Sequence, residues 1–359
     1  MAITYNATDN IITLDGANTY SFEDIYNADQ SGGWGVVSKQ GDDQYFIEAN
    51  ITLGDGSNET QLIDEDCAIQ LGTNANQRWM ETKANSVFRL TTSYFEWYPP
   101  SVQKRWDGKT YFYNSSLYKR GDATWHAPSV YNDIEILNCY LDFNSFFIGA
   151  GNFKTTIKES IFSLNNKSFE YGSSGECDID DLTVKNALYG IKTAVAKKII
   201  FKNCKFSSNT YDIYLSVDNN ELELINSIFD KNKLLFEKNS NILYDKFEFD
   251  IKVIDKNNNP LTGAIVKLYD KNNNLIFEEA TDENGKISTH EVLYRKFEGT
   301  SETETLYTPH TLKITKDGYT DYEAKITIDH KIEDDVFVLD ALTYTYDDIM
   351  KMLKAIYVK

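Results

Sequence analysis

Two short acidic clusters are the residues in this sequence whose types and spacing come closest to a catalytic arrangement. Two carboxylates that flank a glycosidic bond can serve as acid and base or as nucleophile, so such a cluster could cleave a polysaccharide. The same residues also fit solvated acidic strand edges, which discourage pairing with other chains, and we favour that interpretation. The clusters are Asp178, Asp180 and Asp181 in one segment and Asp64, Glu65 and Asp66 in another.

A stretch rich in aromatic residues, residues 92–132, is the stronger candidate for a binding surface. Tyr and Trp rings combine an apolar body with a polar handle, which suits sugars as well as protein partners. The alternative is a locally folded loop that buries its own rings, and composition leaves both possibilities open. The candidate glycan-binding or partner-binding residues are Tyr94, Trp97, Tyr98, Trp106, Tyr111, Tyr113 and Trp125.

Composition disfavours several other kinds of site. The net charge is −19 and no region is basic, so a cationic groove for nucleic acid or an anionic membrane is not expected. The 4 Cys do not form a disulfide scaffold and the 4 His lack a ligand spacing, so we expect neither a metal nor another cofactor. The sequence shows no apolar run long enough to cross a bilayer and no secretory signal, so membrane insertion is not expected.

The elements that must position these residues are indicated by a repeat of about 22 residues in residues 134–249. Each unit begins with alternating apolar and polar residues, which is typical of a strand with one inward face. The alternation then slips by one residue, which indicates a bend between two short strands. The sixth residue of each unit falls at Cys139, Ser160, Leu182, Cys204, Ser227 and Phe247.

These units must stack, because a single unit of this length cannot bury its own apolar face. The pattern resembles the right-handed parallel β-helix, and a leucine-rich repeat fits poorly because the Leu-x-x-Leu-x-Leu run is missing. We therefore predict one interior row with a residue from each successive coil. The row comprises Ile136, Ile157, Ile179, Phe201 and Leu224.

The segments before residue 134 show a looser pattern. Leu53, Leu71 and Leu90 recur at a shorter interval, which predicts three shorter coils. We expect residues 1–40 to form a cap, because an uncapped solenoid end is an exposed strand edge. Residues 92–132 break the pattern and are predicted to form an aromatic insertion.

A different pattern begins after Phe249. Residues 250–268 and 281–285 combine a strand, a Pro turn, Gly-Ala, a second strand and Thr-Asp-x-x-Gly. They resemble the carboxypeptidase-regulatory-like (transthyretin-like) β-sandwich. Some relatives carry a Lys–Asn isopeptide bond, but the position of its Asn is taken here by Asp340, so no such bond is expected opposite Lys252. The Asn/Asp runs of this region could hold calcium, but hairpin turns explain them more simply.

The expected architecture is mostly β, with a right-handed parallel β-helix followed by an immunoglobulin-like or transthyretin-like β-sandwich and a short C-terminal helix. The helix has an apolar stripe and is too short to be stable alone. The stripe consists of Ile349, Met352, Leu353 and Ile356. The predicted parts are a cap at residues 1–40, the β-helix at 41–249, the sandwich at 250–340 and the helix at 341–359.

As a whole, the sequence resembles virion appendage proteins of tailed phages and archaeal viruses, such as tail, baseplate, fiber or head-appendage proteins. The resemblance implies a structural protein made in the host cytoplasm, carried on the virion and involved in attachment to a host surface or glycan. Two alternatives stay open: a polysaccharide depolymerase, either hydrolase or lyase, on the same scaffold, and a cellular surface adhesin. β-Helix hydrolases use Asp residues with a nearby His, and lyases use a basic residue, often Arg, with bound calcium. Residues 127–289 contain neither His nor Arg, so we expect no enzyme activity.

The expected partners follow from the same resemblance. They are other virion proteins, a host polysaccharide or receptor, and further copies of the same chain, most simply in a homotrimer. We expect the apolar stripe of the C-terminal helix to help hold the trimer together, because such a short helix needs a partner surface. The alternative is that the helix docks onto its own sandwich.

Overall fold

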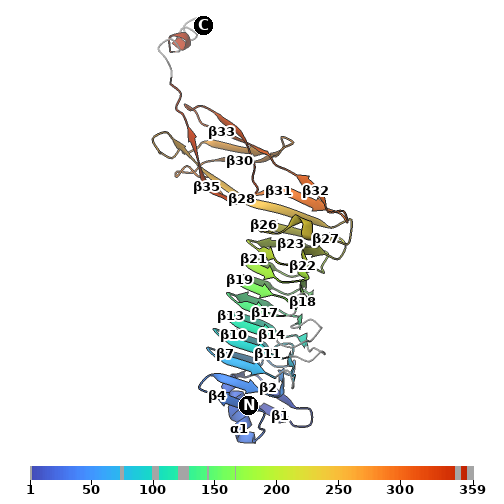
Figure 1. Ribbon diagram of the computed structural model, residues 1–359. Coiled ribbons are helices and arrows are strands. Elements are labelled where there is room, and N and C mark those ends of the chain that lie inside the picture. The colour runs from blue at the N-terminus through green and yellow to red at the C-terminus, as the bar shows by residue number, and fades with distance from the viewer. Residues whose placement is uncertain are drawn as a thin grey trace. The chain divides into compact units, whose positions relative to one another are not determined.

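The computed structural model describes residues 2–72, 77–98, 105–119, 129–143, 145–165, 167–343 and 349–353 (Figure 1). Strands account for 56% of the structure and helices for 6%. Two compact units are present, Met1–Leu243 with Phe297–Thr303 and Tyr244–Lys296 with Glu304–Lys359. The first, here called the solenoid, is a β-solenoid of about 8 turns, and the second, the C-terminal unit, carries a separate antiparallel sheet. The predicted mostly β architecture with a β-helix is confirmed.

Each full coil of the solenoid contributes short strands to three faces, and equivalent strands of successive coils pair in parallel. The first face is an 11-stranded sheet in which only the terminal pair β1–β2 is antiparallel among the described pairs. Its strands are β1 (Ala2–Asn6), β2 (Ile11–Asp15), β6 (Asn50–Leu53), β9 (Met80–Thr82), β12 (Arg105–Trp106), β15 (Ser129–Val130), β18 (Phe146–Gly151), β20 (Ser168–Ser173), β22 (Tyr189–Thr193), β25 (Tyr211–Leu215) and β27 (Leu234–Phe236).

The second and third faces are joined at a corner, and two long strands, β19 and β21, run around it. The second face comprises β3 (Thr19–Tyr20), β7 (Gln61–Glu65), β10 (Val87–Thr91), β13 (Lys109–Tyr113), β16 (Ile134–Leu137), the first halves of β19 (Thr155–Ser163) and β21 (Cys177–Lys185), β23 (Lys198–Lys202) and β26 (Glu221–Ile225). The third face comprises β4 (Val37–Gln40), β5 (Gln44–Ile47), β8 (Ala68–Leu71), β11 (Tyr94–Trp97), β14 (Ser116–Lys119), β17 (Tyr140–Asp142), the second halves of β19 and β21, and β24 (Lys205–Ser207).

The corner between these two faces explains the slip in the sequence pattern. One residue per coil adopts a left-handed backbone conformation there, with φ between 48° and 52°. Asn and Asp tolerate this conformation better than other non-glycine residues. Asn138 also donates from Nδ2 to Oδ1 of Asn114 on the preceding coil, at 3.0 Å. The corner residues are Asp66, Thr92, Asn114, Asn138, Glu159, Asp181, Asn203 and Asn226.

The residue after each corner points inward and forms a ladder of polar groups. The hydroxyl of Ser160 accepts from the N–H of Cys139 on the preceding coil, at 3.1 Å, and donates to the carbonyl of Lys158, at 2.7 Å. Thiols take the same place in other coils, where the Sγ of Cys204 donates to the carbonyl of Lys202 at 3.2 Å. All 8 residues at these positions are buried, and Leu182 alone among them is apolar. The ladder comprises Cys67, Ser93, Ser115, Cys139, Ser160, Leu182, Cys204 and Ser227.

The predicted interior row lies on the second face. Each member is the direct strand partner of the next, and none is more than 2% exposed. The row runs through Ile136, Ile157, Ile179, Phe201 and Leu224, one residue per coil.

The prediction of three shorter coils upstream is wrong. Leu53, Leu71 and Leu90 lie on the first, third and second faces respectively, so their short spacing is the distance between faces of successive coils. The equivalent of Leu71 in the next coil is Trp97, and the equivalent of Leu90 is Phe112. The upstream coils are therefore at least as long as the others.

The predicted aromatic insertion at residues 92–132 is also wrong for the described residues. They supply β11 to β15, which pair in parallel with the strands of neighbouring coils. The aromatic residues broke the sequence pattern because several of them replace aliphatic residues as core side chains. The described part of this stretch is thus a regular portion of the solenoid.

The N-terminal end of the solenoid is covered by helix α1 (Phe22–Gly32) and the hairpin of β4 and β5. Ser21 and Asp24 form a capping box at the start of α1, and Gly33 ends it with φ 64°. Phe22 and Ile25 of the helix are fully buried. Strands β2 and β3, which lie within the predicted cap, already pair with the coil strands β6 and β7.

The C-terminal unit combines a four-stranded antiparallel sheet with a second group of strands around one core. The antiparallel sheet has the order β30 (Leu275–Ala280), β29 (Ile265–Tyr269), β33 (His310–Thr315) and β34 (Tyr322–Ile326). The other strands are β28 (Ile242–Asp255), β31 (His290–Glu298), β32 (Thr303–Leu306) and β35 (Ile332–Leu339), and β28 and β35 pair in parallel. The ends of β28, β31 and β32 include residues that belong to the solenoid. A 3-10 helix, η1 (Lys231–Lys233), lies in the solenoid, and residues 349–353 are helical.

Candidate functional site

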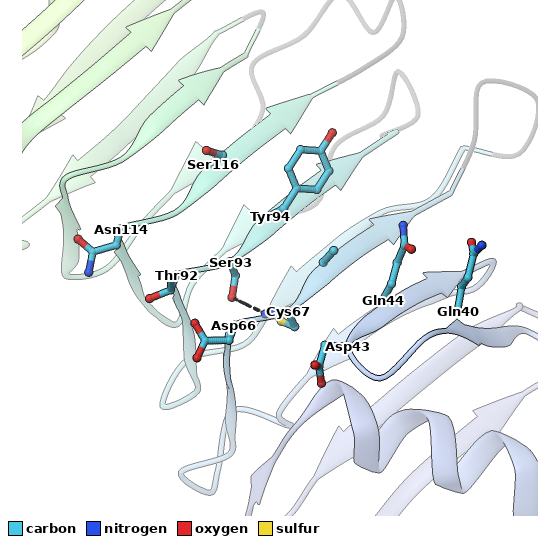
Figure 2. A pocket seen from close by; sticks show the side chains of 11 residues that line it. Gln40, Asp43, Gln44, Asp66, Cys67, Thr92, Ser93, Tyr94, Asn114 and Ser116 are labelled. Carbon is cyan, nitrogen blue, oxygen red and sulfur yellow. Dashed lines mark hydrogen bonds between the residues drawn. The ribbon is translucent and has the colours of Figure 1, made fainter.

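A shallow groove on the third face of the solenoid is the candidate binding site (Figure 2). Its volume is about 550 Å³, which lies in the range usual for small-molecule sites. Its lining comes from strands β4, β5, β8, β11 and β14 and from the corners of three coils. The lining residues used below are Asp43, Gln44, Asp66, Thr92, Tyr94, Asn114 and Ser116.

Tyr94 is the predicted binding residue that the groove contains. It begins β11 and is 38% exposed, whereas Phe95 and Trp97 alternate with it and point into the core. Its ring centroid lies 5.0 Å from that of Tyr118, which in turn lies 5.8 Å from that of Tyr140. The strands β11, β14 and β17 therefore present what we call the tyrosine row: Tyr94, Tyr118 and Tyr140.

Two of the predicted binding residues, Trp97 and Trp106, are instead core residues. Both are 0% exposed, and their rings stack with centroids 5.7 Å apart. The indole N–H of Trp97 donates to the carbonyl of Arg78 at 2.8 Å, and that of Trp106 to the carbonyl of Met80 at 3.0 Å. Because both indole N–H groups are hydrogen-bonded inside the solenoid, neither side chain can contact a ligand at the surface.

The remaining predicted residues lie away from the groove or outside the described residues. Tyr98 is half-buried and donates to Glu96 at 3.3 Å. Tyr111 and Tyr113 project from β13 on the second face, with their ring centroids 6.4 Å apart. Trp125 lies outside the described residues.

Sequence reasoning missed Tyr118 and Tyr140 as site residues, although a signal for them exists. Each tyrosine of the row follows its left-handed corner residue by two or four positions, as Tyr140 follows Asn138. Positions of this parity project outward from the third face. Once the corner residue is identified, an even offset from it indicates an outward side chain such as Tyr94, and an odd offset indicates an inward one such as Trp97.

The thiol nearest the groove is buried and belongs to the ladder. Cys67 lies beneath the groove, with its Sγ 3.4 Å from the hydroxyl of Ser93. Burial raises the pKa of Cys67 to about 12 and that of Cys139 to about 11. Reactive cysteines depend on the thiolate, so these residues act as ladder members only.

Three of the six residues in the acidic clusters, Asp64, Asp178 and Asp180, make contacts within the fold, whereas Asp66 lines the groove. Asp178 forms an ion pair with Lys158 at 2.7 Å, and Asp180 accepts a hydrogen bond from the amide of Asn203 at 2.6 Å. Asp64 accepts the backbone N–H of Phe22 at 2.8 Å, which fixes the start of α1, and burial raises its pKa. Each of the three carboxylates thus supports the packing of coils or of the cap.

The Asn/Asp runs of the C-terminal unit are turns, as the sequence indicated. The carboxylate of Asp255 accepts the backbone N–H groups of Asn257 and Asn259 at 2.8 and 2.9 Å. Asp270 and Asp282 make the same contacts two and four residues ahead. Hydrogen bonds to the charged form hold the pKa of Asp255 and Asp282 below the usual range.

Neither Lys252 nor Asp340 is placed for an isopeptide bond with the other. Lys252 is half-buried beside Val336 on β35, its strand partner. Asp340 forms an ion pair with Lys256 at 3.2 Å, and both of these side chains are more than half exposed. This is a solvated pair and not a buried cross-link site.

The comparisons with known proteins add no family assignment. The sequence matches no known protein family model, and a search of curated proteins finds no significant match. None of the helices in the described part of the chain has the length and apolar character that a membrane crossing requires.

Proposed function

We propose that the protein is a structural attachment protein of a virus particle, and that the third face of its solenoid binds a host surface glycan. The observation that carries the proposal is the tyrosine row beside a polar groove on a regular, multi-coil surface. Repeated coils supply a long stiff surface of this kind. Aromatic rings with adjacent amides, hydroxyls and carboxylates are suited to hold a sugar.

The virion assignment rests on the sequence resemblance to appendage proteins of tailed viruses. A solenoid followed by an antiparallel β unit is consistent with that class, and the C-terminal unit would then be a transthyretin-like module. Fold alone does not define function, so this part of the proposal needs a direct test.

Binding without cleavage is the favoured activity. The carboxylates Asp178 and Asp180 are held by Lys158 and Asn203, and the thiol of Cys67 stays protonated at neutral pH. An enzyme would need an acid and a base that are free to move protons at the same sugar. We therefore place attachment ahead of depolymerase activity.

The proposal includes a homotrimer joined by the C-terminal helix. The described helical residues Ile349, Met352 and Leu353 are between 43% and 50% exposed, so this stripe is available to another chain. Light scattering on the full chain and on a chain that ends at Asp340 tests this part. A full-length monomer at micromolar concentration contradicts the trimer, and a trimer that survives truncation contradicts the role of the helix.

The virion assignment is tested by mass spectrometry of purified virus particles and by the genes adjacent to the coding sequence. We expect the protein in the particles, and genes for capsid, portal or tail proteins nearby. Glycan cleavage is tested by release of reducing ends from host polysaccharide. Cleavage that is lost in Asp178→Asn or Asp181→Asn would replace attachment by depolymerase activity.

A further inference from the structure

The tyrosine row runs from coil to coil in a staggered line, because the strand partner of Tyr94 and Tyr140 is Ser116, two residues before Tyr118. Tyr94, Tyr118 and Tyr140 belong to three consecutive coils, and their ring centroids are 5.0 and 5.8 Å apart. Parallel strands repeat every ~4.8 Å, so one ring is offered per coil. The sugar residues of an extended polysaccharide repeat over a comparable length, and a chain that follows the row can therefore meet one tyrosine per sugar.

The charges around the groove select among polysaccharides. Asp43 and Asp66 are the charged residues among the described residues that line it, and both are exposed. Glu96 and Asp142 lie beside the row on β11 and β17. The Nζ of Lys185 lies 5.6 Å from the ring of Tyr140, which lies beyond the groove. An acidic polysaccharide would meet like charges at the groove, whereas an uncharged one would find hydrogen-bond partners there.

The backbone at the groove supplies an independent observation. Thr92 is the one β-branched residue among the described corner residues with a left-handed conformation, at φ 50°. Such a conformation is a genuine outlier for this residue type, and strained residues gather at ligand sites. Asn or Asp would fit the corner better, as at Asn114 and Asp66, yet this position in the middle of the groove carries Thr (Figure 2).

Together these observations point to a more specific ligand, and we infer that the groove and tyrosine row bind an uncharged polysaccharide whose chain runs along the solenoid axis. Tyr94 contacts the sugar ring at the groove, and Asp66, Thr92 and Asn114 bind its hydroxyl groups from the three successive corners. Tyr118 and Tyr140 contact the following sugars. This inference rests on the proposed attachment function and names the ligand class and its direction.

The test uses the full chain on an array of immobilised neutral and acidic glycans, followed by calorimetric titration with the best soluble polymer. We expect binding to neutral glycans, with affinity that rises with the number of sugars up to three or more and changes less than twofold between low and high salt. Retention by acidic glycans alone, or by no glycan on the array, overturns the inference.

Matched tyrosine variants locate the site. Tyr94→Ala is expected to weaken binding at least tenfold and Tyr118→Ala by severalfold. Tyr111→Ala, which removes a half-buried tyrosine from the second face, should change binding less than twofold. If Tyr111→Ala has the larger effect, the tyrosine row is not the binding surface.

Thr92→Asn separates binding from folding. The variant relieves the backbone strain at the corner, so we expect it to be at least as stable as the parent chain. We also expect it to bind the glycan severalfold more weakly. Unchanged binding would remove Thr92 from the site. If the protein is found in purified particles but binds no glycan, the ligand assigned here is wrong while the virion assignment stands. If the protein is absent from particles but binds the glycan, the virion assignment is wrong while the ligand assigned here stands.

Discussion

The solenoid and the C-terminal unit differ in how their buried polar groups find partners. In the solenoid, one device is repeated in nearly every coil: a left-handed corner followed by an inward Ser or Cys that satisfies the backbone of its own and the preceding coil. In the C-terminal unit, the buried side chains Asp245 and His310 do not belong to such a coil-by-coil series. Asp245 is 1% exposed and paired with Arg295 at 2.7 Å, and His310 is fully buried.

The two units also differ in how far apart their partners lie along the chain. Solenoid pairs such as Ile157 and Ile179 join adjacent coils, so stability accumulates from neighbour to neighbour. In the C-terminal unit, Phe249 pairs with Ile332 across most of the unit. Damage to one coil should therefore stay local at first, whereas damage to the C-terminal core should affect that unit as a whole.

The largest effect is expected from Phe201→Asp. Phe201 is 0% exposed between Ile179 and Leu224 in the interior row, so the variant buries an unpaired carboxylate at a cost of several kcal/mol. We expect loss of hydrogen-exchange protection in the coils around it while the C-terminal unit keeps its protection.

Leu312→Asp is the matched variant in the C-terminal core, where Leu312 is also 0% exposed. It should remove protection from that unit throughout. If Phe201→Asp unfolds both units together, or if Leu312→Asp has only a local effect, the contrast between them is wrong.

The sequence predicts the downstream coils well and the upstream coils poorly, for a physical reason. From residue 134 onward the interior row is aliphatic or Phe, and short turns keep the period near-constant. Upstream, bulky Trp97 and Trp106 fill the interior, and Leu53, Leu71 and Leu90 mark three different faces. Apolar spacing alone does not say which face a strand belongs to, because that depends on where the chain turns.

The candidate site could be predicted only in part for a related reason. Composition indicates the stretch that holds Tyr94 as a binding surface, but it does not distinguish Tyr94 from Trp97, three residues later. Inward and outward positions alternate along a strand, so a shift of one residue exchanges core and surface. The corner residue fixes that parity, and its left-handed conformation is a property of the folded chain. The groove itself also needs Asp43 and Gln44 from a hairpin that the repeat does not reveal.

The second prediction concerns the ladder inside the solenoid. Ser160→Ala leaves the N–H of Cys139 without its buried acceptor, which should lower the free energy of unfolding by about 1–3 kcal/mol. Cys139→Ser should cost much less, because serine makes the same two contacts in neighbouring coils. Urea denaturation of both variants measures the difference. Equal losses for the two would mean that volume, and not hydrogen bonding, determines the ladder.

The third prediction uses the buried His310 of the C-terminal unit. Burial lowers its pKa from the ordinary 6.5, so its neutral form is the one that fits the fold. Above pH 6.5 His310 is neutral in both the folded and the unfolded chain, so its contribution to the free energy of unfolding does not change with pH. As the pH falls below 6.5 the unfolded chain takes up a proton that the folded chain does not, and stability declines by at most about 1.4 kcal/mol per pH unit.

Asp245 opposes this trend, so the comparison must be made between variants. Burial raises the pKa of Asp245 to about 6 despite Arg295, so the folded state binds a proton first and gains stability as the pH falls from about 6 towards 3.8. His310→Phe should remove the part of the acid loss that begins at pH 6.5, as measured by thermal unfolding between pH 5 and 7.5. His330→Gln, at an exposed histidine, is the control and should leave the profile unchanged. A profile that is unaltered by His310→Phe contradicts the role of this residue.

The smallest effect should come from exchanging the residue at a single solenoid corner. Thr92 occupies with strain a conformation that Asn138 occupies easily two coils later, at φ 50° and 51°. Thr92→Asn should therefore raise the free energy of unfolding by about 1 kcal/mol, and Asn138→Thr should lower it by a similar amount. Asn138→Thr also loses the side-chain amide that donates to Asn114, so its loss should slightly exceed the gain at the other corner. Chemical denaturation of the two single variants and of the double exchange is the measurement. Because the sites lie in non-adjacent coils, the stability change of the double variant should be close to the sum of the two single changes.

A stability gain at position 92 that accompanies weaker glycan binding would show that this coil gives up stability for its groove. A loss of stability in Thr92→Asn would mean that the corners are not interchangeable and that the solenoid is less uniform than its repeated contacts indicate.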